Sequence, residues 1–288
     1  MLLQFIINGI IAGSLYSIVA LGYTLIYGIA RRINFAQGEI YMFGSFCFFA
    51  FAVERSVHPI FSCILAIFLS AIIGLLIERF AYRPLQNASR LAPLISTIGV
   101  SIFLQGFITF LYGPNSKTLR QGEVEAGFDF FSATITKTQI VIIFLCIILM
   151  VGLHLLLHLT KFGKAVRTTA EDSEIAITVG INTTRIIQAV FAISAALAGA
   201  AGIMAGFNNT IEPTMGTVAG FKGFTAAVLG GIGNIIGAVL GGFIIGIAEN
   251  LGAGYISSEY KDTVAFIILF IMLLFRSRGI LGKKAVRL

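Results

Sequence analysis

Long apolar runs with almost no charged side chain divide the chain, and they restrict the fold more than any other feature. They lie at about residues 5–30, 38–53, 59–78, 91–113, 139–159, 186–207, 224–251 and 262–275. A helix of about 18 or more such residues crosses a hydrocarbon layer roughly 30 Å thick. Because backbone polar groups in lipid need partners within their own segment, each run predicts a helix. The sequence therefore predicts an all-α fold, a polytopic integral membrane helical bundle with about eight apolar spans.

The composition excludes a water-soluble globular fold. Hydrophobic residues make up 57% of the 288 positions and charged residues 11%, whereas soluble domains carry about 25% charged residues. No segment has the composition of a soluble domain, so residues 1–288 are expected to form a single transmembrane domain. Cys47, Cys63 and Cys146 lie in apolar runs and are not spaced as CxxC, which predicts neither a disulfide framework nor a zinc site.

Basic residues predict the orientation of the chain. The net charge of +7 is carried by short clusters between apolar runs, as expected for orientation signals rather than for a nucleic-acid partner. The clusters after the first, third and fifth runs contain Arg31, Arg32, Arg79, Arg83, Arg90, Lys161, Lys164, Arg167 and Arg185. These loops are expected in the cytoplasm, whereas the near-neutral loop from 114 to 138 suits the outer side. The amino terminus is then outside, and it lacks the basic region of a cleavable signal because no Lys or Arg precedes Arg31.

The carboxyl terminus requires one more passage than the apolar runs supply. The tail carries Arg276, Arg278, Lys283, Lys284 and Arg287, which predict a cytoplasmic end. Eight crossings from an outside start would instead end outside. We therefore expect the glycine-rich segment from 216 to 254 to divide into a short helix or half-helix before Gly233 and a full span after it.

The expected break makes Gly231, Gly233 and Asn234 candidate residues of a transport pathway. Broken helices at membrane depth are tolerated only where protein or a water-filled cavity covers the freed backbone. A simple kinked and tightly packed helix is the alternative. Glycines also recur four residues apart, which allows helix backbones to approach closely and suits either a compact bundle or a dimer. These are Gly9 and Gly13, Gly202 and Gly206, Gly233, Gly237 and Gly241, and Gly242 and Gly246.

Three polar residues, Asn34, Gln37 and Glu39, open the second apolar run. A carboxylate near bilayer depth is costly, so such residues are candidates for a pathway. The alternative is that Glu39 pairs with Arg31 or Arg32 at the membrane interface. The sequence leaves both interpretations open.

The cytoplasmic loop from about 161 to 185, KFGKAVRTTAEDSEIAITVGINTTR, has an ordered pattern. Thr168 and Glu171 have the spacing of a capping box, and Gly180 followed by Ile181 suits a Schellman-type stop. A short helix of about nine residues is therefore expected between them. Its apolar face would seat in the groove of a partner, and Thr183 or Thr184 would cap the next membrane helix. The face consists of Ile175, Ala176 and Val179.

Signatures of catalysis are absent from the sequence. There is no GxxxxGK[ST] and no HExxH, so the chain is not itself an ATPase or a zincin. His154 and His158 are four residues apart and could pair on a metal, but no third ligand is near, which favours interfacial histidines. An ion-coupled carrier or channel would need charges at mid-span and inverted repeats, and a membrane enzyme would need a convergent polar constellation. The sequence gives no sign of either.

Three motifs resemble one transporter family. Glu174, Ala176 and Gly180 resemble the E-x-A-x-x-x-G core of the cytoplasmic loop of ATP-binding-cassette (ABC) importer permeases, with Ile175 in place of the first alanine. The wider string GKAVRTTAEDSEIAITVGIN is similar to the form found in permeases of branched-chain amino acid uptake, the LivH type. INFAQGEIYMFGSF and GGIGNIIGAVLGGFIIGIAEN agree with the same family.

The resemblance implies a permease that imports leucine, isoleucine and valine across a bacterial inner membrane. It implies four kinds of neighbour: a second, LivM-like permease, two cytoplasmic ATPase subunits, a periplasmic substrate-binding protein and the lipid bilayer. Glu174, Ala176 and Gly180 would lie in the helix that couples to the ATPase. ATP and Mg would bind the partner subunits, with no cofactor in this chain. Related permeases carry urea or short amides, and nothing in these residues excludes that cargo.

Overall fold

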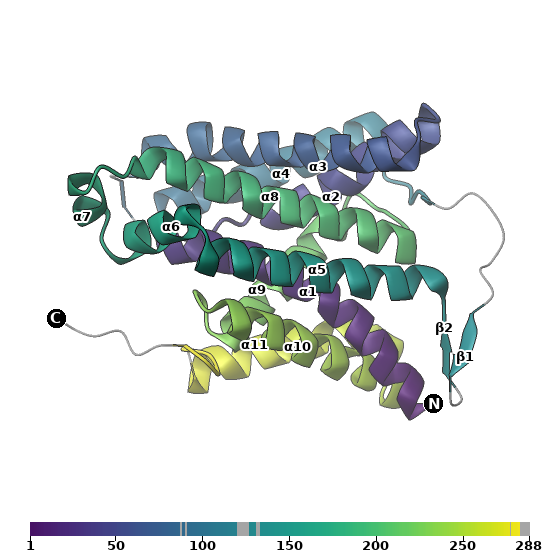
Figure 1. Cartoon of the computed structure of the whole chain (residues 1–288). Coiled ribbons are helices and arrows are strands. Elements are labelled where there is room, and N and C mark those ends of the chain that lie inside the picture. Colours follow the sequence, from purple (N-terminus) through teal and green to yellow (C-terminus); the bar gives the residue numbers. More distant parts are fainter. Residues whose placement is uncertain (87, 90, 120–126, 131–132, 277, 283–288) are drawn as a thin grey trace.

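The computed structural model describes residues 1–86, 88–89, 91–119, 127–130, 133–276 and 278–282. Most helices run along one common axis, and a short β-hairpin lies at one end (Figure 1). In the first half the helices are α1 (Leu2–Ala30), α2 (Gln37–Phe49) with its π-helical extension η1 (Ala50–Glu54), α3 (Pro59–Leu76) with η2 (Ile77–Tyr82) and η3 (Arg83–Leu85), and α4 (Ala92–Tyr112).

The second half begins with the hairpin, whose strands β1 (Phe128–Phe130) and β2 (Ala133–Ile135) pair antiparallel with Asp129 opposite Thr134. The helices that follow are α5 (Lys137–Leu159), α6 (Lys161–Glu171), α7 (Ser173–Thr178), α8 (Thr183–Asn208), α9 (Met215–Gly230), α10 (Ile235–Tyr255), η4 (Ser258–Tyr260) and α11 (Lys261–Phe275). The predicted all-α membrane bundle is therefore confirmed.

The number of spans differs from the prediction. Within the described residues, 6 helices are long and apolar enough to cross a membrane. They are Leu2–Ala30, Pro59–Leu85, Ala92–Tyr112, Lys137–Leu159, Thr183–Asn208 and Ile235–Tyr255. The other apolar runs form α2, α9 and α11, which have 13, 16 and 15 residues. A count of eight full spans is thus not reached, because these three helices are short.

The glycine-rich segment is divided as expected. Gly231 and Gly233 have φ values of 101° and 95°, a backbone region that residues with a β-carbon avoid. These glycines end α9 and let the chain turn into α10, where the Asn234 side chain accepts a hydrogen bond from the Gly237 amide at 3.1 Å. The break between α9 and α10 therefore depends on the positive φ angles of these two glycines.

The two ends of the bundle hold different elements, with α6 and α7 at one end and the β-hairpin at the other (Figure 1). At one end, Arg31 after α1 donates to the Ala170 carbonyl of α6 at 3.3 Å, and Arg32 donates to the Leu85 carbonyl of η3 at 2.9 Å. At the other end, the amino terminus meets the hairpin, where the Thr134 amide donates to Gln4 at 2.8 Å. The described basic loops thus gather at one end. Other charged residues of the orientation argument, Arg90, Lys283, Lys284 and Arg287, lie outside the described residues.

The glycine pairs of α1 and α10 pack against each other inside this chain. A β-carbon at Gly9 would lie 2.7 Å from the Ile247 Cα, and one at Gly246 would overlap the Gly13 backbone. The close approach lets the Ser17 hydroxyl donate to the Val239 carbonyl at 2.9 Å. These glycines therefore build the bundle interior, and the dimer interpretation of the same pattern is wrong for them.

We predict that Gly246→Leu will lower the stability of the folded bundle by about 1–3 kcal/mol, because the new side chain has no room against α1. Gly152→Leu is the matched control, since an added β-carbon at Gly152 meets nothing within 4 Å. Thermal unfolding of both purified variants in detergent measures the difference. Equal melting temperatures would contradict the close packing of α1 on α10.

Candidate functional site

Helix α6 is fixed to the end of α5. The Thr160 hydroxyl accepts a hydrogen bond from the Gly163 amide at 3.0 Å and so caps the start of α6. The Arg167 guanidinium donates to the Leu157 carbonyl near the end of α5, which is one of the free carbonyls that a helix end leaves. These two bonds therefore fasten the start of α6 to the end of α5.

Helix α7 begins at a different cap from the one expected. The Asp172 carboxylate accepts from the Glu174 and Ile175 amides at 2.8 and 3.1 Å. Thr168 lies inside α6, where its hydroxyl donates to the Lys164 carbonyl at 3.0 Å. The predicted capping box is therefore wrong, because a threonine inside a helix can bond its own preceding turn. The loop holds two helices in place of one.

The end of α7 follows the prediction. Gly180 has φ 83°, the Ile181 amide donates to the Ala176 carbonyl at 2.9 Å, and the Gly180 amide donates to the Ile177 carbonyl at 3.0 Å. This pair of bonds is the Schellman motif. The cap of α8 is Asn182, whose side chain accepts from the Arg185 amide at 3.1 Å, so the expectation of Thr183 or Thr184 as that cap is wrong.

The three residues of the resembled loop motif play different structural parts. Glu174 and Gly180 are exposed, whereas Ala176 is fully buried. Ala176 therefore seats α7 on the protein and is not part of a free apolar face. The exposed aliphatic side chains of α7 and its cap are Ile175 at 57%, Ile177 at 59% and Val179 at 64%. We call these three the apolar tip.

A second candidate region is the start of α2, where Asn34, Gln37 and Glu39 are all buried. The Asn34 side chain accepts from the Ala36 amide at 3.2 Å, and the Gln37 side chain donates to the Ser194 carbonyl at 3.0 Å. These bonds hold the non-helical backbone that leads into α2. All three polar residues are therefore enclosed by the fold.

Glu39 lies where α2, α4 and α9 meet. Its Oε1 atom accepts from the Thr217 hydroxyl at 2.8 Å and from the Ser101 hydroxyl at 3.2 Å. Its Oε2 atom is buried without a hydrogen-bond partner. Glu39 and Thr217 are the third residues of α2 and α9, so the amide-rich first turns of two helices stabilise the carboxylate.

The interfacial alternative for Glu39 is not supported. Arg31 and Arg32 bond to backbone carbonyls, and within the described ranges no basic side chain forms an ion pair with Glu39. Gln37 does not join Glu39, because its side chain lies against Gly22 and Ser194, on the α1 and α8 side of α2. The two polar side chains thus face different neighbours.

The other candidate pathway residues, Gly231, Gly233 and Asn234, lie beyond the opposite end of α9 from Glu39. There residues 278–282 lie against the end of α9. The Ile280 and Leu281 amides donate to the Leu229 and Gly230 carbonyls at 2.8 and 3.0 Å. The Asn234 side chain donates to the Leu281 carbonyl at 2.9 Å. The tail therefore supplies partners to the last carbonyls of a helix that stops early. The candidate pathway residues predicted from the sequence therefore lie in two separate regions, one at the start of α2 and one between α9 and α10.

Sequence reasoning missed a buried ionic group. Lys222 of α9 lies 2.6 Å from Glu249 of α10 and 2.6 Å from Asp262 of α11. The Tyr16 hydroxyl of α1 accepts from Lys222 and donates to Glu249, both at 3.3 Å. Lys261 approaches Glu249 to 3.7 Å. We call these five residues the Lys222 cluster. The available signal was a lone lysine inside the apolar stretch GFKGF, which predicts a buried partner.

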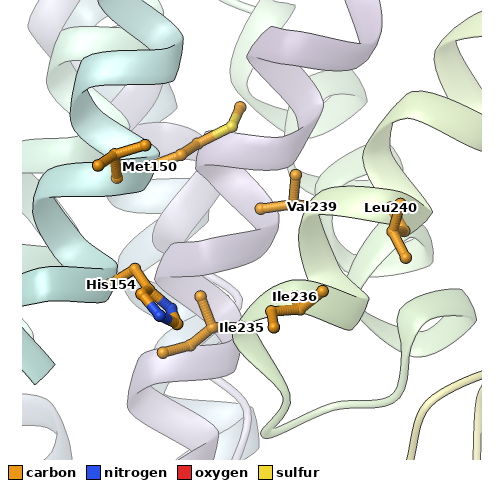
Figure 2. Close-up of a pocket in the computed structure, with 7 residues that line it drawn as sticks. Met150, His154, Ile235, Ile236, Val239 and Leu240 are labelled. Carbon is orange, nitrogen blue, oxygen red and sulfur yellow. The ribbon is translucent and has the colours of Figure 1, made fainter. Parts of the chain in front are cut away.

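The cavity in Figure 2 lies between α5 and α10 and has a volume of about 220 Å³. Its labelled lining residues are Met150, His154, Ile235, Ile236, Val239 and Leu240. The lining is apolar apart from one imidazole, and the His154 and His158 rings stack at 4.1 Å. Across the described part of the chain, no three potential metal ligands come together. This cavity therefore lacks the polar groups that would orient a charged cargo.

Comparison with known proteins covers nearly the whole chain. Residues 5–273 match the family described as branched-chain amino acid transport system / permease component. The high-affinity branched-chain amino acid transport system permease protein LivH of Escherichia coli (strain K12) is 44% identical, covering 99% of this chain and 96% of that protein. BraD of Pseudomonas aeruginosa is 43% identical over 99% of this chain and 97% of that relative.

A less similar relative and one solved structure also match most of the chain. The probable branched-chain amino acid transport permease protein LivH of Methanocaldococcus jannaschii is 34% identical, covering 98% of this chain and 94% of that protein. The solved structure of PsaBC from Streptococcus pneumoniae in complex with Fab has a TM-score of 0.52 at 14% identity, over 94% of this chain and 92% of that chain, which shows a shared fold. The chain therefore belongs to the family of branched-chain amino acid transport permeases.

Proposed function

We propose that this chain is the permease subunit of an ABC importer that takes up leucine, isoleucine and valine across the bacterial inner membrane. Membership of the family over residues 5–273 is the observation that carries the proposal. The chain has no phosphate-binding motif, so the energy would come from ATP and Mg bound to two partner ATPase subunits. A second, LivM-like permease and a periplasmic binding protein complete the proposed assembly.

The apolar tip is the proposed contact with the ATPase. Three exposed aliphatic side chains on a short helix at one bundle end suit a groove in a cytoplasmic partner. Because Arg167 ties α6 to α5 and Arg31 ties α1 to α6, a displacement of α7 would be passed to the spans. The basic loops at the same end support placing that end in the cytoplasm and the amino terminus outside.

The junction of α2, α4 and α9 is the proposed part of the pathway in this chain. Glu39 is a buried carboxylate with one unbonded oxygen and no cationic partner within the described residues. A carboxylate of this kind inside a membrane protein is a candidate for a role in transport. The ammonium group of an amino acid offers the positive charge that this carboxylate lacks, whereas urea does not.

We predict ATP-dependent uptake of labelled leucine by vesicles that contain the chain, its partner subunits and the cognate binding protein. Uptake should persist when an ionophore removes ion gradients, because ATP hydrolysis supplies the energy. Labelled urea in a parallel assay tests the alternative cargo. Uptake that needs the gradient and ignores ATP would indicate an ion-coupled carrier and overturn the proposal.

For the apolar tip we predict that Ile175→Asp with Val179→Asp will weaken binding to the ATPase subunits at least tenfold, a loss of about 1.4 kcal/mol or more. Each carboxylate would have to lose its water on docking. Lys164→Asp places the same charge on an exposed site of α6 and serves as the control. Co-purification and affinity measured in detergent decide the result. Equal affinities for both proteins would place the ATPase contact elsewhere.

For the pathway we predict that Glu39→Gln will reduce the maximal rate of leucine uptake by roughly tenfold, the equivalent of about 1.4 kcal/mol in a barrier. The amide keeps the shape of the side chain but not its charge, so insertion should be unchanged. Glu54→Gln alters an exposed carboxylate at the end of the same helical segment and should leave uptake intact. Full uptake by the Glu39 variant would make that residue a purely structural group.

A further inference from the structure

The Lys222 cluster joins four helices through one cation. Lys222 belongs to α9, and its ammonium group contacts Tyr16 of α1, Glu249 of α10 and Asp262 of α11. Lys222 and Glu249 are both buried. A buried ion pair gains little stability over apolar packing, but losing one partner leaves an uncompensated charge and is costly. The pair therefore constrains where α9 can lie against α10.

The two carboxylates bonded to Lys222 are not equivalent. Glu249 is fully buried, whereas 54% of the Asp262 side chain is exposed. Asp262 also lies in the first turn of α11, where the helix dipole stabilises a negative charge. Asp262 can thus separate from Lys222 and be hydrated, but Glu249 cannot. Breaking the bond to Asp262 should therefore cost less free energy than breaking the bond to Glu249.

Helix α11 is held to α9 at both of its ends. At its start the holding contact is the Lys222–Asp262 ion pair, and beyond its end the Ile280 and Leu281 amides bond to α9 carbonyls. Between these points Ala265 is the one residue of α11 that is buried. Residues 261–276 and 278–282 therefore form a strap over α9. Its start is attached to α9 by a half-exposed ion pair and to α10 by the 3.7 Å approach of Lys261 to Glu249. Its far end is attached by a pair of backbone hydrogen bonds.

We propose that Lys222 and Glu249 are positioning residues for transport, and that the strap releases its Lys222–Asp262 attachment in each transport cycle while the tail attachment stays closed. The proposal rests on the proposed import function. Release would open the bundle at the end that holds the amino terminus, because Lys222 and Asp262 lie on that side of the strap. Helices α9 and α10 would keep their register through Glu249.

A disulfide between α10 and α11 tests this motion directly. A β-carbon built at Gly252 lies 3.9 Å from the Val264 Cβ, close to the mean of about 3.8 Å in disulfides. Gly252→Cys with Val264→Cys, in a chain whose Cys47, Cys63 and Cys146 are replaced by alanine, should cross-link readily in the nucleotide-free assembly. Cross-linking should slow several-fold when ATP is held at the ATPase subunits.

The cross-linked assembly should lose leucine uptake more than tenfold and recover it when dithiothreitol reduces the disulfide. The two single-cysteine variants, oxidised in the same way, are the controls and should keep uptake. Full uptake by the cross-linked protein, or equal cross-linking rates with and without ATP, would overturn the proposal. If the reduced protein imports no leucine, the cargo assignment fails, and the cross-linking rates still decide whether the strap moves.

Charge variants separate the two attachments of Lys222. Asp262→Asn should insert and fold normally but transport several-fold fewer leucine molecules per ATP, because the closed position is no longer favoured. Glu259→Gln, which alters an exposed acid in the preceding short helix η4, is the matched control. Glu249→Gln should reduce the folded yield, and adding Lys222→Met should restore the yield without restoring transport. A normal number of leucine molecules per ATP in both the Asp262 variant and the double variant would show that the cluster is purely structural. That result would overturn the proposal.

Discussion

The absence of water in the hydrocarbon layer governs this structure, because each carbonyl and amide there must find a partner inside the protein. Unbroken helices meet that requirement by themselves, but the chain departs from helix before α2 and between α9 and α10. At the first place Asn34 and Gln37 bond to backbone groups. At the second, Asn234 and the tail do so. At both of these places, side chains or a returning segment supply hydrogen-bond partners to the irregular backbone.

Two buried carboxylates illustrate two ways of holding a charge in this environment. Glu249 is neutralised by a lysine at 2.6 Å, which fixes neighbouring helices in place. Glu39 has hydroxyl donors and two helix starts instead of a cation, so its charge is solvated but not cancelled. A group of the second kind can still attract a passing cation. A group of the first kind can respond only by exchanging its partner.

Features that depend on neighbouring residues predicted much of the fold. Contacts between residues far apart in the sequence could not be predicted. Apolar runs predicted helices because lipid leaves a segment few other conformations, and Gly180 predicted the end of α7 because its backbone angle is local. The prediction that Thr168 caps a helix was wrong, because its hydroxyl donates to the Lys164 carbonyl inside α6. Lys222 gave no local clue to its partners, which lie 27 and 40 residues further on at Glu249 and Asp262.

The candidate site was predictable in part for the same reason. The polar residues at the start of α2 were identified, but the separation of Gln37 from Glu39 was overlooked, although helix geometry alone indicates it. Residues two apart on a helix are separated by roughly 200°, so Gln37 and Glu39 had to face different helices. The family resemblance was found because it depends on strings of adjacent residues, and these the sequence displays directly. The pairing of Glu39 with Thr217 needed the fold.

The bonds from the tail to α9 have a consequence for how the protein is made. The Leu229 and Gly230 carbonyls receive their partners from Ile280 and Leu281, residues that leave the ribosome about fifty positions later. Until then the two carbonyls at the end of α9 lack these hydrogen-bond partners. Completion of the interior therefore waits for the last part of the chain, and a nascent protein that stops before residue 280 carries exposed backbone at the bundle end that also holds α6 and α7.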